Sequence, residues 1–232
     1  MLGSAPPNCF RQLRERGFHH HVFLSWPNEI ENQGQRVVEQ LARSLQDRFR
    51  SYGGGSVFWD REALRSPGED WEKKLRWSLC RSGVTVVILV LSYFESEFCR
   101  LEWNITEQLQ QRRLPESPET CFIPILLKPD FELPEEVYKL VYESAFSQML
   151  SYGKSPQHHP SWNKEVDRLV GHIRERLKSL CEASENPPDW KEEEAIAMNA
   201  GPKQFDWTKK RQPSIPGQGR KLPPPVRLGS KL

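Results

Sequence analysis

The chain has 232 residues, which is enough for one domain of roughly 130 to 180 residues with extensions at its ends. Its 33 basic and 31 acidic residues nearly balance, so no overall charge points to a nucleic acid or an anionic membrane as partner. The longest apolar run, Val84 to Leu91, has the length of a strand and is far too short to cross a membrane. Since the N-terminus lacks the basic and apolar regions of a signal peptide, we expect a cytoplasmic protein.

The cysteines predict reduced thiols and no metal site. They are odd in number, widely spaced and form no CxxC pair, which disfavours a disulfide framework. The histidine clusters at 19–21 and 158–159 have no cysteine at the spacing of a zinc site, so we expect neither a metal nor another cofactor. The five cysteines are Cys9, Cys80, Cys99, Cys121 and Cys181.

The first half of the chain alternates strand and helix patterns. Residues 21–26 predict a short strand that ends at Pro27, and residues 34–50 predict a helix with one apolar stripe. A glycine run at 53–55 ends this helix, and residues 56–60 predict the second strand, followed by a loop at 61–68. Asp70 is expected to cap the next helix, which places Trp71, Leu75 and Leu79 on one face.

The second half continues the alternation. Residues 84–91 predict a buried strand, residues 97–111 a helix, and residues 120–127 a strand. Pro124 inside the last of these indicates a position near the edge of the sheet or at a bulge. The remaining patterns predict a short helix at 135–141, a small last strand near 145–150 and a long amphipathic helix at 161–182.

Strands that alternate with helices imply right-handed crossovers and a parallel sheet covered on both faces. We therefore predict a flavodoxin-like, doubly wound α/β domain with a five-stranded, mostly parallel sheet. The domain is expected to span residues 18–182, after an N-terminal extension of residues 1–17. Residues 183–232 are Pro-rich and basic, which predicts a disordered tail. Its aromatic residues, Trp190, Phe205 and Trp207, either dock onto the domain, contact a partner or have no role.

Glu102 stands out by its position. It follows the buried strand 84–91 closely, at the start of a helix, where open α/β sheets place their chemistry. A carboxylate in the first turn of that helix can stabilise positive charge on a bound ligand. It can equally accept hydrogen bonds from the free backbone N–H groups at the helix start. The position alone leaves both interpretations open.

Four motifs in order change this balance. They are Val22-Phe23-Leu24-Ser25-Trp26, then Val57-Phe58-Trp59-Asp60 with a loop to Pro67-Gly68, then a strand ending Leu91-Ser92-Tyr93, and finally Ser96-x-Phe98-Cys99-x-x-Glu102. Together they resemble the Toll/interleukin-1 receptor (TIR) domain over roughly residues 20–180, in wording closest to bacterial members. A phospho-acceptor receiver domain, which has a similar fold, needs acidic residues after the first strand and at the end of the third. This chain has Ser25-Trp26 and Leu91-Ser92 there.

Enzymes of the TIR family cleave the bond between nicotinamide and ribose in NAD. The resemblance therefore implies this activity for the chain, with NAD as its substrate. Glu102 matches the catalytic glutamate of the family. Phe98 stands where the family usually has Trp, one helical turn before Glu102. The resemblance places further substrate contacts at the ends of the strands, in the loop and in the following helices: Ser25, Trp26, Asp60, Arg61, Arg65, Trp71 and Cys99.

Most of these residues also have a structural interpretation. Trp26 can pack in the core, Trp71 can be a hydrophobic anchor, and Ser25 can be a small residue that lets loops approach. Asp60 can orient its loop by accepting backbone hydrogen bonds, and arginines in an exposed loop are commonly solvated.

Two functions from different classes follow from the resemblance. One is an NAD nucleosidase, a hydrolase or cyclase in immune or defence signalling. The other is a scaffold without catalysis, which binds itself or other TIR domains through the BB loop, Arg61 to Gly68. Glu102 with its aromatic neighbours favours the enzyme, whereas Phe98 and Pro27 depart from the enzyme pattern. A third reading makes the Pro-rich tail a ligand in polyproline II form.

Overall fold

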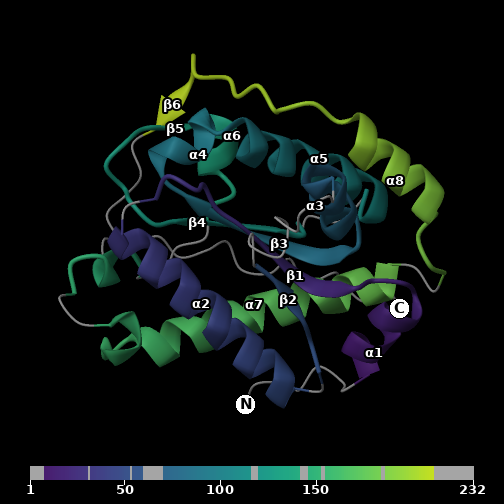
Figure 1. Cartoon of the computed structure of the whole chain (residues 1–232), viewed down its shortest axis with the longest axis horizontal. Helices are drawn as coiled ribbons and strands as arrows, with labels where there is room; N and C mark the ends of the chain where they lie inside the picture. The colour runs from purple at the N-terminus through teal and green to yellow at the C-terminus, as the bar shows by residue number, and fades with distance from the viewer. Residues whose placement is uncertain are drawn as a thin grey trace, which may run out of the picture.

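The computed structural model describes residues 8–30, 32–52, 54–59, 70–115, 120–141, 146–152, 155–183 and 186–211. Its centre is a four-stranded sheet in the order β2-β1-β3-β4, with every neighbouring pair parallel. The strands are β1 (His20–Ser25), β2 (Val57–Phe58), β3 (Ser82–Leu89) and β4 (Phe122–Leu126). The predicted doubly wound α/β fold is thereby confirmed (Figure 1).

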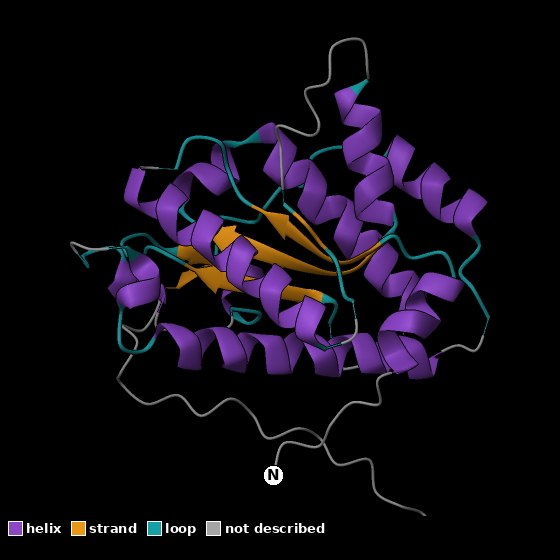
Figure 2. Ribbon diagram, turned by 60° about the horizontal axis from the view of Figure 1, so that its bottom comes forward, coloured by secondary structure: helices purple, strands orange, loops and turns teal. Residues whose placement is uncertain are grey.

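Helices cover both faces of this sheet (Figure 2). One face packs against α1 (Asn8–Glu15), α2 (Asn32–Ser51) and α7 (Trp162–Ala183). The other packs against α3 (Trp71–Cys80), α5 (Glu97–Arg113) and α8 (Trp190–Asn199). Because successive strand residues point to opposite faces, Val22 and Leu24 enter the first core while Phe23 enters the second. Among the described helices, none is both long and apolar enough for a membrane span.

The positions of β3 and β4 in the sheet agree with the sequence, which predicts that β3 is buried and that β4 lies near an edge. All eight residues of β3 are buried, and the strand lies between β1 and β4. β4 is an edge strand, in which Pro124 pairs with Val87. A proline at an edge removes no donor that a further strand would need, so the edge position inferred from Pro124 is confirmed.

The small fifth strand expected near residues 145–150 is absent from the described part of that segment. Phe146–Met149 forms a 3-10 helix, η2, and residues 142–145 lie outside the described residues. Phe146 and Met149 are both fully buried, and their spacing of three is the repeat of a 3-10 turn. The apolar content that suggested a strand therefore belongs to one face of this turn.

Short elements complete the fold. α4 (Leu91–Glu95) follows β3 directly, α6 (Glu135–Tyr138) follows β5 (Leu133–Pro134), and η3 spans Pro156–His158. β5 pairs in antiparallel fashion with β6 (Lys210–Arg211) in a separate two-stranded sheet.

Residues 186–211, which the composition assigned to a disordered tail, form an ordered strap across the domain. The strap begins with α8, crosses the outer side of α5 and ends at β6 (Figure 1). Trp190 donates from Nε1 to the carbonyl of Arg16 at 3.0 Å. The rings of Phe205 and Trp207 contact the ring of Phe94, with centroid distances of 5.0 and 5.2 Å. The aromatic residues of this segment thus dock onto the domain. Residues 212–232 lie outside the described residues.

Candidate functional site

The candidate site lies at the carboxyl ends of β1 and β3. The chain runs from β1 through α2 to β2 on one side, and then crosses to β3 on the other side of β1. Such a reversal between neighbouring strands is the place where doubly wound sheets bind ligands. Ser25 is the last residue of β1, and α4 and α5 begin shortly after β3 ends.

Glu102 reaches this point from the second turn of α5. The helix begins at Glu97, and its N-cap is Ser96, whose Oγ accepts a hydrogen bond from the N–H of Cys99 at 3.3 Å. The Glu102 side chain is 1% exposed, and its Oε2 accepts a hydrogen bond from Ser25 Oγ. The first-turn position and the helix-start role considered for Glu102 are therefore wrong, because Ser96 caps the helix.

A hydrogen-bond chain continues from Ser25 into the protein. Ser25 Oγ lies 3.1 Å from the hydroxyl of Tyr93 on α4, and this hydroxyl donates to the carbonyl of Cys99 at 3.0 Å. Ser25 and Tyr93 are both fully buried. Tyr93 was missed as a site residue, although its place directly after the third strand was part of the motif.

Two aromatic residues mark the outer side of the site. Trp71, the first residue of α3, contacts Phe98 edge to face, with ring centroids 4.6 Å apart. Both side chains are exposed, at 39% and 38%. Phe98 lies one turn before Glu102, and helical side chains lean toward the N-terminus, so Phe98 lies on the N-terminal side of the buried carboxylate. The fold therefore brings together Trp71 and Phe98, which were both predicted to contact the substrate.

Other predicted site residues have different surroundings. Trp26 is partly buried and packs against the core on the α2–α7 face, as its structural interpretation expected. The side chain of Cys99 lies in the core with Trp103 and Phe122, and its carbonyl belongs to the hydrogen-bond chain. Asp60, Arg61 and Arg65, like the whole segment 60–69, lie outside the described residues.

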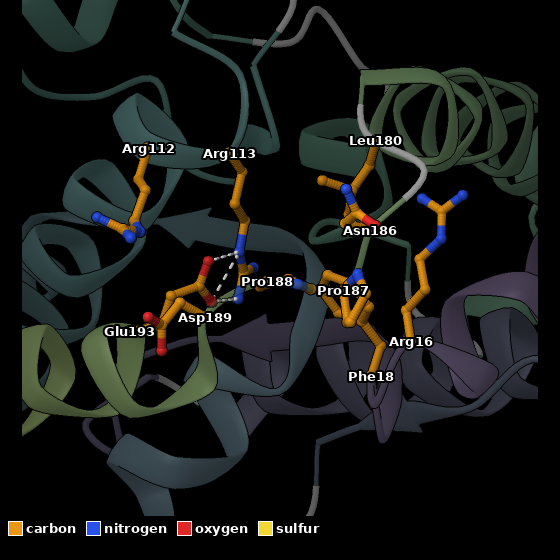
Figure 3. A pocket seen from close by; sticks show the side chains of 10 residues that line it. All are labelled: Arg16, Phe18, Arg112, Arg113, Leu180, Asn186, Pro187, Pro188, Asp189 and Glu193. Carbon is orange, nitrogen blue, oxygen red and sulfur yellow. Dashed lines mark hydrogen bonds and ion pairs between the residues drawn. The ribbon is translucent and has the colours of Figure 1, made fainter.

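A cavity of about 140 Å³ lies near the amino ends of β1 and β3, between the segment after α1, the end of α5 and the start of the strap (Figure 3). Its arginines bind protein groups. Arg16 donates to the carbonyl of Cys181 at 2.9 Å, Arg113 pairs with Glu193, and Arg112 pairs with Glu192. None of the residues that line this cavity belongs to the Glu102 site. Within the described ranges, no group of three or more His, Cys, Asp and Glu residues could hold a metal ion.

Comparison with known proteins agrees with the motifs. The family model of the TIR domain matches residues 22–170, which is more than half of the chain. The match runs from β1 into α7 and includes the segment that carries Ser25, Tyr93 and Glu102. No curated protein matches the chain.

Proposed function

Since the chain belongs to the TIR domain family, we propose that it cleaves the bond between nicotinamide and ribose in NAD, with Glu102 as the catalytic carboxylate. The observation that carries this proposal is the placement of Glu102 at the β1–β3 switch point, hydrogen-bonded to Ser25. An exposed aromatic pair, Trp71 and Phe98, lies beside it. A carboxylate and aromatic faces are the two kinds of group that a nicotinamide nucleotide needs.

The chemistry requires little beyond this arrangement. Nicotinamide leaves as a neutral molecule, and the ribose passes through an oxocarbenium-like state with positive charge at C1′. A carboxylate held beside that carbon stabilises the charge, while the aromatic pair offers a surface for a ring of the substrate. Water or a group of the substrate itself then bonds to C1′, which gives a hydrolysed or a cyclic product.

Glu102 exposes only 1% of its surface, so a substrate can contact the carboxylate only after the groups around it shift. TIR domains commonly self-associate or bind other TIR domains. We propose that self-association through the BB loop, residues 61–68, opens the site in this chain. Substituting Arg65→Glu is then expected to reduce oligomer size in light scattering and NAD turnover together. Full turnover by a strictly monomeric variant would contradict this assembly step.

NAD consumption by the purified chain, measured over a range of protein concentrations with identification of the products, tests the activity. Glu102→Gln should lower turnover by on the order of 100-fold, because one preorganised electrostatic partner of the transition state is lost. The matched control is Glu97→Gln, which changes an exposed glutamate of the same helix and should leave turnover unchanged. Equal turnover of both variants would rule out Glu102 as the catalytic group.

The second candidate function is a TIR scaffold without catalysis. The specific observation in its favour is the burial of both Glu102 and Ser25, since a buried hydrogen bond between them can serve stability alone. In that case the wild-type chain shows no NAD cleavage even when concentrated and self-associated. Glu102→Gln is then expected to change the melting temperature. The function to measure is in that case the binding of the chain to a second TIR domain.

A further inference from the structure

Two cysteines that are far apart in sequence meet where α1 lies beside the end of α7 (Figure 1). Cys9 is the second residue of α1, and Cys181 lies in the last turn of α7, 172 residues later. The Cys9 thiol donates to the carbonyl of Leu177 at 3.2 Å, one turn before Cys181. The Cys181 thiol donates to the carbonyl of Cys9 at 3.5 Å. Each sulfur therefore contacts the backbone of the other helix, and the two thiols also lie within hydrogen-bonding reach of each other.

These crossed contacts have the arrangement that a disulfide needs. A disulfide forms with little backbone movement only where two cysteines lie close together and their side chains point toward each other. Cys9 and Cys181 meet in this way at the border of the first core, where they are 5% and 8% exposed. Both lie in terminal turns of their helices, where the backbone has fewer intrahelical hydrogen bonds and adjusts more easily.

The surroundings favour a thiolate on one of the two sulfurs. The pKa of Cys181 is lowered, mainly because the Cys9 thiol can donate a hydrogen bond to the thiolate. Burial opposes this shift, and the positive charge of Arg16, which donates to the Cys181 carbonyl at 2.9 Å, adds to it. The pKa of Cys9 is raised, because the same bond holds its proton. Since the thiolate is the form that reacts with oxidants, Cys181 is expected to react first.

Cys80 has none of these features. It is fully buried in the second core, away from the α1–α7 contact, and burial raises its pKa to about 12. A buried thiol of this kind is unreactive at neutral pH. Cys80 therefore provides a matched control for the pair.

We propose that Cys9 and Cys181 form a redox-sensitive pair, which a peroxide converts into a disulfide between α1 and α7. The inference does not depend on the proposed cleavage of NAD. A low-pKa thiol beside a second cysteine that can resolve its oxidised form is the usual composition of a redox-sensing site. The bond would join two helices that pack on the same face of the sheet.

The reaction takes two steps. In the first, the Cys181 thiolate attacks an oxygen of hydrogen peroxide, an S–O bond forms and the O–O bond breaks. The hydroxide that leaves takes up the proton released by Cys181 and becomes water. In the second, the Cys9 sulfur attacks the sulfenic acid of Cys181, the S–S bond forms and the S–O bond breaks. The leaving hydroxide takes the Cys9 proton, so two electrons pass from the thiols to the peroxide, which becomes two molecules of water.

Mass spectrometry of the full chain after treatment with hydrogen peroxide tests the pair. Remaining thiols are alkylated during denaturation, so that only bonds made in the folded chain are detected. We expect the peptides of Cys9 and Cys181 to be recovered as one disulfide-linked species, which dithiothreitol separates. The bond should also raise the melting temperature by roughly 5 to 15 °C, because it restricts the unfolded chain.

Two variants locate the effect. Cys9→Ala removes the resolving thiol, so peroxide should leave a sulfenic acid at Cys181 that dimedone traps, without a rise in melting temperature. Cys80→Ala should retain both the link and the rise. The absence of the linked peptide from peroxide-treated wild type would overturn the inference, as would links from Cys80 to either residue in equal amount. Because the link is measured on the wild type, this result stands even if a variant does not fold.

Discussion

Arg113 on α5 and Glu193 on α8 form an ion pair that is buried on both sides, with side chains 6% and 1% exposed and a distance of 2.6 Å from Nη2 to Oε2. Arg113 also donates to the carbonyl of Cys80, the last residue of α3, and to that of Ser82, the first residue of β3. This single side chain therefore joins the strap to the amino end of the central strand. The neighbouring pair between Arg112 and Glu192 is much more exposed, at 35% and 54%.

The two pairs give a matched test of how the strap is held. Glu193→Gln leaves the charge of Arg113 buried without its counterion, which typically costs about 3 to 5 kcal/mol of unfolding free energy. Glu192→Gln makes the same chemical change at an exposed pair and should cost less than about 1 kcal/mol. Urea titrations of both variants measure these losses. Similar losses for the two would show that water reaches the Arg113–Glu193 pair.

Gly83 and Gly171 test the packing of α7 on β3. A Cβ atom at Gly83 would lie 2.7 Å from Leu177 Cδ2 and 3.2 Å from the carbonyl oxygen of His21. Gly83→Ala should therefore destabilise the protein by about 1 to 3 kcal/mol, as overpacking does. Around Gly171, inside α7, no atom beyond its chain neighbours and the nearby backbone of its own helix lies within 4 Å of such a Cβ, so Gly171→Ala should stabilise by up to about 1 kcal/mol. Thermal melts of the two variants should shift in opposite directions, and a shift in the same direction would contradict this packing.

Trp71 is expected to act in substrate binding rather than in stability, because its side chain is 39% exposed. If a ring of NAD stacks on it, Trp71→Ala should raise KM by roughly tenfold, since stacking on an aromatic side chain contributes on the order of 1 to 3 kcal/mol. Phe98→Trp, which introduces the aromatic residue usual in the family, should retain turnover. Tyr52→Ala removes a similarly exposed aromatic residue directly after the end of α2 and serves as the control. An unchanged KM in Trp71→Ala would exclude the stacking role.

Two histidines of β1 should make the protein less stable in acid. Burial lowers the pKa of His20 from 6.5 to about 4, and burial also lowers the pKa of His21, whose Nδ1 accepts a hydrogen bond from the N–H of Ser56 at 3.0 Å. The unfolded chain then binds more protons than the folded chain below pH 6.5. The contribution of these two groups to the free energy of unfolding is fully present above about pH 6.5. It is lost progressively as the pH drops toward about 4.

Urea midpoints measured over that pH range check the prediction. His21→Gln should weaken the pH dependence, because one of the two residues that must stay neutral is gone. His158→Gln, at an exposed histidine, should leave the dependence as it is in the wild type. A wild-type midpoint that does not change between neutral pH and about pH 4 would contradict the prediction.

Local patterns predicted most of the fold. Asp70 caps α3 as expected, by accepting from the N–H of Lys73, and α7 spans Trp162–Ala183 against a predicted 161–182. The apolar content of β3 placed it at the centre of the sheet. These features depend on residues close together in sequence, so hydrophobic period and cap chemistry are sufficient to find them.

The strap could not be predicted in the same way. The run of glutamates at 192–194 resembles a solvated helix, and its partners on α5 and in the turn before β3 are visible only once the chain has folded. The same holds for the site. A motif pointed to Glu102, but the bonds among Ser25, Tyr93 and Glu102 join residues that are distant in sequence. Such contacts leave no periodic signal.

The strap also sets the smallest piece of the chain that can fold by itself. A fragment cut at residue 170, where the family match ends, stops inside α7 and lacks Ile173, Leu177 and Leu180, which are buried in the core. A fragment that ends with α7 would leave the rings of Phe94 and Trp103 without the aromatic residues that cover them. Apolar faces uncovered in this way promote aggregation. Recombinant production should therefore retain the chain through Arg211, well past residue 170, where the family match ends.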